Sequence, residues 1–342
     1  NANMWQRSAN GISVSASSNN TVIHNFTYAN EDSGVQFYAG SSYNRVIGNV
    51  SYGNADHGID FNASPYNTVN GNTVHGNVTA GINFEGDPVG SDGATVINNI
   101  MFDNGVLLLA GGGTASGTVS NLRFDTRSFA ENTLDYNLYY LDVGTIQIID
   151  WNGVKYATLA DFQAAVPGQE INGLESDPLF VAPAPIAIRP SNTVGGLPAL
   201  NVGNYYITAG SPAIDSANSD APYQPSTDID GNGREDDLAT PNTGAGVRAY
   251  DDRGAYEFLP SGEYQPTVTT QAVTVIGTTT ATGNGNITVL GVPNPTQYGV
   301  VWGTAINPTV ALSTKTTQGT IGVTGPFTSN ITGLTSGTLY HV

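Results

Sequence analysis

The sequence contains no cysteine, and only ten of its 342 residues are lysine or arginine. Disulfides and thiolate metal sites are therefore excluded, and the chain needs no oxidative folding step if it is exported. The 28 acidic residues give a formal net charge of −18, which argues against nucleic acid and against an anionic membrane surface as partners. Neutral glycans, cations and other proteins remain as candidate partners.

Long apolar runs are also missing. No stretch approaches about eighteen consecutive apolar residues, so we expect no membrane-spanning helix. Residues 1–10 lack the basic and apolar regions of a signal peptide, so an exported protein would be present here in a processed or excised form. A chain of this length exceeds what one hydrophobic core normally supports, so we expect at least two units, and an elongated solenoid is one form that a unit of this size can take.

What the sequence does contain is an internal repeat with a period of about 24 residues. Four asparagine anchors announce it, and a second asparagine follows five residues after each: Asn25, Asn49, Asn72 and Asn99, then Asn30, Asn54, Asn77 and Asn104. An aromatic residue or histidine stands three residues after each anchor: Tyr28, Tyr52, His75 and Phe102. We expect the asparagines to stack as ladders at bends and the rings to stack in the interior, with His75 as a packing residue.

Glycine opens an alternating segment in each coil, as in Gly58-Ile59-Asp60-Phe61. Alternate side chains of a strand face opposite sides, so the apolar members predict one shared interior. These members are Ile12, Val14, Val35, Phe37, Ile59, Phe61, Ile82 and Phe84. Strands separated by a fixed short coil run parallel to their counterparts, about 4.8 Å away in the next coil. The pattern predicts an all-β fold, with a right-handed parallel β-helix from about Asn10 to Gly105.

This register resembles the right-handed parallel β-helix repeat proteins, a superfamily that includes pectate lyases, polygalacturonases, alginate epimerases and many uncharacterised bacterial surface proteins. Later segments are similar to the second half and the closing segment of the uncharacterised group: 135–140, 151–153, 176–180, 210–215 and 253–258. The resemblance implies a β-helix domain over residues 1–260. Independently, Thr158 followed by Asp161 predicts the N-cap of one short helix.

From Gln265 onward charge nearly vanishes, and short runs of Thr, Val and Gly alternate, which is typical of a small β-sandwich. We expect strands at 273–276, 278–281 and 298–302. Residues 334–340 resemble the tyrosine corner of fibronectin type III modules, which implies such a module over 261–342. Tyr340 would stand near the sixth of about seven strands, so we expect a truncated module. Further chain or a neighbouring molecule would complete its open edge, and self-assembly through that edge or through the β-helix end would build filaments.

The outward face of the strands after each glycine is the predicted site. Asp60 and Glu85 should lie roughly 8 Å apart, which is within the range of an inverting glycosidase pair. With Asp56 and His57 just upstream they are the candidate catalytic residues, and the candidate glycan-binding residues are Gln36, Tyr38, Asn62 and Asn83. Alternatively these positions are polar only because outward positions of any solenoid are polar.

A lyase mechanism would need a basic residue on this face, usually beside a calcium ion. The regular coils contain no lysine, and their only arginine is Arg45, in a turn. An arginine from the later half, such as Arg123 or Arg127, would have to reach the face.

A calcium site is predicted separately in the loop that begins at Asp228. Side-chain or carbonyl oxygens at Asp228, Asp230, Asn232, Arg234 and Asp236 follow the first part of an EF-hand-like loop, with glycine at its sixth position. The twelfth position is Ala239 instead of glutamate, so another carboxylate would have to complete the shell. A solvated acidic turn is the competing interpretation.

Together these observations favour a secreted or cell-surface modular protein. Its β-helix would be a rigid, glycan-contacting platform with an adhesive or structural role. The alternative is a polysaccharide-active enzyme, either an inverting glycoside hydrolase or a lyase, and a third is a glycan-binding module of a larger enzyme.

Overall fold

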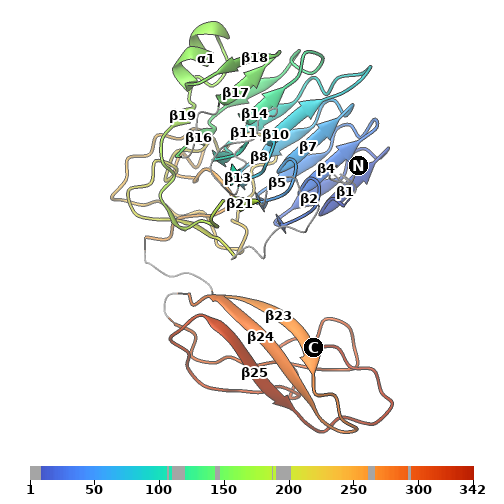
Figure 1. Cartoon of the computed structure of the whole chain (residues 1–342). Coiled ribbons are helices and arrows are strands. Elements are labelled where there is room, and N and C mark those ends of the chain that lie inside the picture. Colours follow the sequence, from blue (N-terminus) through green and yellow to red (C-terminus); the bar gives the residue numbers. More distant parts are fainter. Residues whose placement is uncertain are drawn as a thin grey trace. The chain divides into compact units, whose positions relative to one another are not determined.

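The computed structural model describes residues 9–105, 108–109, 120–142, 147–186, 188–189, 202–260, 266–291 and 294–342. The chain divides into two compact units, Asn1–Phe258 and Leu259–Val342, which are described separately. Among the described residues the regular elements are strands, apart from the helix α1 (Leu159–Ala165) (Figure 1). The predicted all-β fold is confirmed. No helix in these ranges has the length and apolar character needed to cross a membrane.

The first unit is a parallel β-helix in which each coil contributes one strand to each of three sheets (Figure 1). Sheet A contains, in spatial order, β1 (Ile12–Ser15), β4 (Val35–Tyr38), β7 (Ile59–Asn62), β10 (Ala80–Glu85), β14 (Ser120–Phe124), β17 (Gln147–Trp151) and β18 (Val154–Tyr156). All neighbours in sheet A are parallel except β17 and β18, which form an antiparallel pair.

The other two sheets are parallel throughout. Sheet B contains β2 (Thr21–Ile23), β5 (Arg45–Ile47), β8 (Thr68–Asn70), β11 (Thr95–Ile97) and β15 (Thr133–Asp135). Sheet C contains β3 (Phe26–Tyr28), β6 (Val50–Tyr52), β9 (Thr73–His75), β12 (Ile100–Phe102), β16 (Leu138–Tyr140) and β19 (Leu174–Glu175). Two further pairs are β13 (Leu108–Leu109) with β21 (Ile188–Arg189), and β20 (Phe180–Ala182) with β22 (Asn204–Ile207).

The predicted register of sheet A is confirmed. Phe61 pairs with Phe37 on one side and with Phe84 on the other, and all three side chains are fully buried. Their rings stack with centroids 5.0 Å and 4.8 Å apart, and Phe124 continues the stack 4.4 Å beyond Phe84. The alternation of apolar and polar residues therefore built one continuous core along the axis.

The glycines that open the strands of sheet A are required because a side chain at these positions would collide with the next coil. At Gly58 an added Cβ would lie 2.4 Å from Val74 Cγ1 and 2.7 Å from the carbonyl oxygen of Gly81, the equivalent glycine of the next coil. Gly34 is confined in the same way, with the Gly58 carbonyl oxygen at 2.7 Å. Only glycine allows successive coils to approach this closely.

Both predicted asparagine ladders are present. Asn49 donates its side-chain amide to Asn72 Oδ1 at 3.0 Å, and Asn72 donates to Asn99 at 2.9 Å. The second ladder connects Asn54 to Asn77 at 2.8 Å in the same manner. Each side-chain oxygen also accepts the backbone N–H of the preceding rung, so these buried bends leave few unsatisfied polar groups.

The third predicted ladder stacks in two pairs, Tyr28 on Tyr52 and His75 on Phe102, but it does not fill the interior. In the short strands of sheet C the middle residue points inward, as Val74 and Met101 do, so the ring column lies on the outer face. Tyr205 of β22 covers this face: its ring packs on Tyr52 and His75, and its hydroxyl lies 2.9 Å from His75 Nδ1. His75 is a packing residue, as predicted, but beneath the closing segment.

Arg253 binds the closing segment, by which we mean residues 202–258, to the coils. This buried guanidinium donates to the backbone oxygens of Asn137 at 3.0 Å and Asn172 at 2.9 Å. Gly254, next to it, donates its N–H to the Asn98 oxygen. The predicted N-cap also occurs, because Thr158 Oγ1 accepts the Asp161 N–H at the start of α1.

The second unit contains an antiparallel sheet with the order β23 (Thr267–Thr274), β24 (Ala281–Val289) and β25 (Gly325–Ile331). The strand predicted at 278–281 is wrong, because Gly277 N–H bonds to the Thr280 oxygen in a turn and β24 begins at Ala281. Sequence reasoning missed β24 because glycines interrupt it. The phenyl ring of Phe327 would lie 2.5 Å from a Cβ at Gly285, so packing requires glycine there.

The strand predicted at 298–302 is reduced to an isolated bridge between Val301 and Lys315, although Val300 and Trp302 are buried in the core of this unit. Tyr340 Oη accepts a hydrogen bond from the Thr335 backbone N–H at 3.2 Å. This is the type of contact that characterises a tyrosine corner, while the fibronectin-like identity of the module remains a prediction.

Candidate functional site

Sheet A carries two columns of side chains on the face that points away from the core. The polar ladder runs along the middle of the strands and contains Ser13, Gln36, Asp60, Asn83, Arg123 and Asp150 on successive rungs. The outer column lies two residues further along each strand and contains Ser15, Tyr38, Asn62 and Glu85. Both columns follow from strand alternation, because the core residues occupy the positions between them.

Asp60 is held inside the polar ladder. Gln36 donates its amide to one carboxylate oxygen at 2.9 Å, and Asn83 donates to the other at 2.7 Å. The residue is only 2% exposed. Burial raises the pKa of the Asp60 carboxyl to about 6, although His57 opposes this effect. A group so enclosed cannot meet a polymeric substrate without movement of its neighbours.

Glu85 has a different environment, because a guanidinium reaches it. Arg123 Nη1 lies 2.7 Å from Glu85 Oε2 and donates to Asn83 Oδ1 at the same distance. Asn62 donates to the other Glu85 oxygen at 3.2 Å. Burial alone would raise the pKa of Glu85, but His57 and Arg123 outweigh burial and bring the pKa below its ordinary value. Glu85 is therefore ionised under conditions where Asp60 holds its proton.

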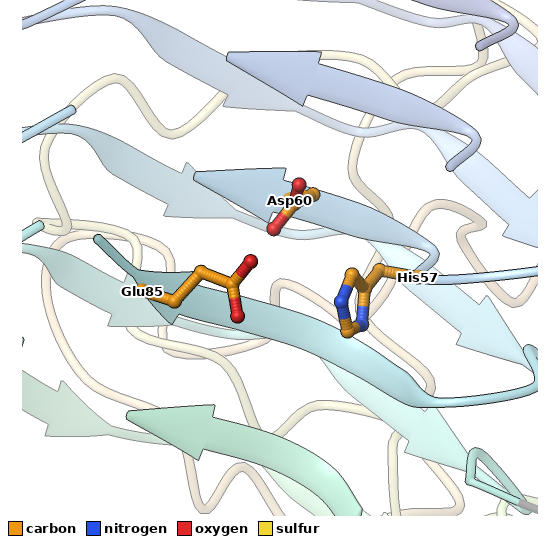
Figure 2. Close-up of side chains that lie close together, drawn as sticks. All are labelled: His57, Asp60 and Glu85. Atoms are coloured by element: carbon orange, nitrogen blue, oxygen red, sulfur yellow. The ribbon is translucent and has the colours of Figure 1, made fainter. Parts of the chain in front are cut away.

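His57 precedes β7 and is buried beside these carboxylates. Each of His57, Asp60 and Glu85 offers one potential metal-ligand atom, and these three atoms lie within 4.8 Å of one another. Figure 2 shows the three side chains close together. Thr79 Oγ1 donates to Asp56 Oδ1 at 2.5 Å and lies 2.9 Å from His57 Nδ1. Among the described residues this is the one group of three or more His, Asp or Glu side chains with ligand atoms so close.

The separation of Asp60 and Glu85 is shorter than the sequence suggested. Rung and strand counting gave roughly 8 Å, but oxygens of the two carboxylates lie within 4.8 Å. Glu85 is long enough to lean back along the strand, whereas the counting considered backbone positions only. The pair leaves less room for a water molecule than the roughly 6.5–9.5 Å typical of inverting glycosidases.

The predicted binding residues differ in accessibility. Tyr38 is 49% exposed, and Asn62 and Glu85 beside it are half-buried, so the outer column can be reached from solvent. Asn83 is fully buried, and Gln36 is half-buried and bonded to Asp60. The structure thus brings the predicted residues onto one face but leaves mainly the outer column available to a ligand.

Sequence reasoning assigned no role to Tyr43 or Tyr66, and it left open whether Arg123 reaches the outward face of sheet A. Arg123 does reach the face, through a coil longer than the regular period, which repeat counting could not place. Tyr43 and Tyr66 are exposed, and their rings stack with centroids 5.2 Å apart in the turns that follow β4 and β7. Both tyrosines stand directly before an asparagine, Asn44 or Asn67, and this equal position was the available signal.

The loop predicted to bind calcium is occupied by its own hydrogen bonds. Asp228 is buried, and its Oδ1 accepts the backbone N–H groups of Asp230 and Asn232 at 3.0 Å and 2.8 Å. Its other oxygen accepts the Glu257 N–H at 3.2 Å. Asp230 accepts the Tyr206 hydroxyl, and Arg234 forms a buried ion pair with Glu257 at 2.7 Å.

Within the described residues, Asp228, Asp230 and Asp236 do not form a group of three converging ligand atoms. Calcium at this loop therefore stays a prediction, and the geometry gives Asp228 a structural task that needs no cation.

Comparison with known proteins agrees with the coil architecture. Residues 1–129 match a family model described as a right handed beta helix region, which covers the coils from β1 to β12 and β14. The first unit thus contains a right-handed β-helix repeat. No curated protein and no solved structure matches the chain.

Proposed function

We propose that this β-helix protein is an extracellular or cell-surface module with an adhesive or structural role, and that the outer column of sheet A contacts neutral glycans. The observation that carries the proposal is the division of the outward face. Its carboxylates are bound internally, by Gln36 and Asn83 at Asp60 and by Arg123 at Glu85, whereas Tyr38 is open to solvent. A face of this kind suits binding better than turnover.

The outer column offers the two features that sugar recognition needs. An exposed aromatic ring supplies apolar surface for the C–H face of a sugar, and amide and carboxylate groups supply hydrogen bonds. Tyr38, Asn62 and Glu85 provide these on adjacent rungs, about 4.8 Å apart. The chain's charge of −18 favours neutral over acidic polysaccharides, which would be repelled.

Affinity electrophoresis in gels containing neutral or acidic polysaccharides tests this proposal. We expect at least one neutral polysaccharide to retard the protein, and Tyr38→Ala to reduce the retardation. Tyr28→Ala is the matched control, because Tyr28 is 38% exposed but lies on sheet C. Equal retardation of wild type and Tyr38→Ala by every polymer that binds, or no binding at all, would reject the outer column as a glycan site.

A second candidate function is polysaccharide cleavage, favoured by one observation. The pKa values of two neighbouring carboxyls are pushed apart, with Asp60 raised by burial and Glu85 lowered by His57 and Arg123 despite its own burial. Such pairs supply an acid and a base in many enzymes. Reducing ends report hydrolysis and unsaturated products report elimination. Turnover that is abolished by both Asp60→Asn and Glu85→Gln would establish this function in place of simple adhesion.

A further inference from the structure

We infer that His57, Asp60 and Glu85 form a binding site for one divalent transition-metal ion, with His57 bound through Nε2. The inference stands apart from glycan contact, because metal binding can be measured directly on the intact chain. It rests on the arrangement of hydrogens around His57 and on the free lone pairs of the two carboxylates.

The tautomer of His57 follows from the number of hydrogens on Thr79. A threonine hydroxyl has one hydrogen, and Thr79 gives it to Asp56 Oδ1, 2.5 Å away. The 2.9 Å contact between Thr79 Oγ1 and His57 Nδ1 therefore requires the hydrogen to be on Nδ1. In the neutral ring this leaves Nε2 with an unshared pair of electrons, which is the form that binds metals.

Nε2 of His57 accepts no hydrogen bond from the part of the chain that the structure describes, although the residue is only 4% exposed. Asp56 Oδ1, another acceptor, lies 3.6 Å from this nitrogen. Because Nε2 has no donor in this part of the chain, its electron pair is available to a cation. Thr79 accepts the hydrogen on His57 Nδ1 and is itself held by Asp56. Metal-bound histidines are commonly oriented in this way, by a residue that accepts the hydrogen of the ring nitrogen that does not bind the metal.

The carboxylates retain electron pairs for a metal. Each oxygen of Asp60 accepts one amide, and each oxygen of Glu85 accepts one donor, so every oxygen keeps a second lone pair. The ligand atoms lie within 4.8 Å of one another, and a tetrahedral zinc site needs about 3.4 Å. Glu85, whose side chain is 30% exposed, can make most of this adjustment.

Ligand chemistry selects the class of ion. One imidazole with two carboxylates suits zinc and its neighbours in the first transition row, whereas calcium prefers six to eight oxygens and magnesium keeps several waters. The local charge also favours a cation. Asp56 Oδ1 lies 3.6 Å from His57 Nε2 and adds a third carboxylate to those of Asp60 and Glu85, while the guanidinium of Arg123 pairs with Glu85. Arg123 bonds to Glu85 Oε2, and within the described residues Glu85 Oε1 accepts only the Asn62 amide.

Isothermal titration of chelator-treated, full-length protein with zinc chloride tests the inference, and cobalt absorption reports the ligand set. We expect one equivalent of zinc to bind and His57→Gln to weaken that binding at least 100-fold. Thr79→Val, which removes the orienting hydroxyl, should weaken it about 10- to 100-fold. His341→Gln, in the second unit, is the matched control for adventitious binding by a half-buried imidazole, and it should change nothing.

Circular dichroism would show whether His57→Gln folds, and Glu85→Gln serves as a second variant because its side chain is partly exposed. Magnesium or calcium at the same concentration should not displace cobalt. The inference is overturned if wild type binds no stoichiometric zinc, or if folded His57→Gln and Glu85→Gln both bind zinc as wild type does.

Discussion

The carboxylate of Glu170 accepts the side-chain amide of Asn137 at 2.6 Å and so ends the first asparagine ladder. Along this ladder each asparagine donates its side-chain amide to the side-chain oxygen of the next one, as Asn72 does to Asn99 and Asn99 does to Asn137. The last member needs only to accept at this position, and a carboxyl oxygen does so whether the group is ionised or carries its proton on the other oxygen. The Tyr139 hydroxyl, also 2.6 Å away, fills the remaining capacity of the same oxygen.

Stability of the first unit should fall as pH rises, and Glu170 should be a main cause. Burial raises the pKa of Glu170 from 4.5 to about 7, so the native state binds more protons than the unfolded state between these values. The contribution is fully present below pH 4.5 and is lost by about pH 7. In urea unfolding at pH 5 and pH 8, Glu170→Gln should remove on the order of 3 kcal/mol of the pH-dependent difference.

Glu131→Gln is the control for this measurement, because Glu131 is exposed and the substitution removes the same charge from the neighbouring coil. An equal pH dependence in wild type and Glu170→Gln would show that Glu170 titrates normally. Asp60, whose pKa is raised to about 6 by burial, should add a smaller effect of the same sign.

Internal rungs of the asparagine ladder should matter more than its first rung. Asn72 is fully buried, and its removal leaves the Asn49 backbone N–H without its acceptor and takes one hydrogen bond each from the Asn49 side-chain amide and the Val46 backbone oxygen. Asn72→Ala should cost at least about 3 kcal/mol of unfolding free energy, because each stranded group costs about 1–3 kcal/mol. Asn25→Ala, at the half-buried first rung, should cost about 1 kcal/mol or less. Comparable losses in chemical denaturation would contradict the ladder argument.

Phe61 should be among the residues on which the first core depends most. Its ring is fully buried between Phe37 and Phe84, so truncation leaves a cavity that the rigid stack cannot close. Phe61→Ala should lower the unfolding free energy by about 3–5 kcal/mol. Tyr38→Ala, on the other face of the same sheet, should change it by less than about 0.5 kcal/mol. A loss below about 1 kcal/mol for Phe61→Ala would mean that the stack can close around the missing ring.

Asp228 should stabilise the closing segment whether or not calcium is present. Its carboxylate accepts three backbone N–H groups in a buried turn, so Asp228→Ala should cost about 2–4 kcal/mol. Melting curves with calcium and with chelator separate the two roles of the loop. A calcium-dependent rise in melting temperature that disappears in Asp236→Asn would support the predicted cation site, because ligands that bind only the folded form stabilise it.

The fold of the first unit could be predicted from the sequence because its signal is local and repeated. Alternation after Gly34, Gly58 and Gly81 determined which side chains face inward, and the asparagine spacing determined the bends. The second unit was harder. Glycines in β24 serve close packing against Phe327, and in a single sequence they read as turn residues.

The site shows the same division. The sequence by itself placed Asp60 and Glu85 on one outward face, with His57 just upstream, because strand periodicity decides which side of the sheet a residue occupies. Only the tertiary structure decided that Asp60 is enclosed by amides and that Glu85 is paired with Arg123. It also decided that the ring column of sheet C is covered by Tyr205, about 130 residues beyond His75. These contacts join residues whose separation along the chain does not follow the repeat, so the periodicity of the sequence cannot predict them.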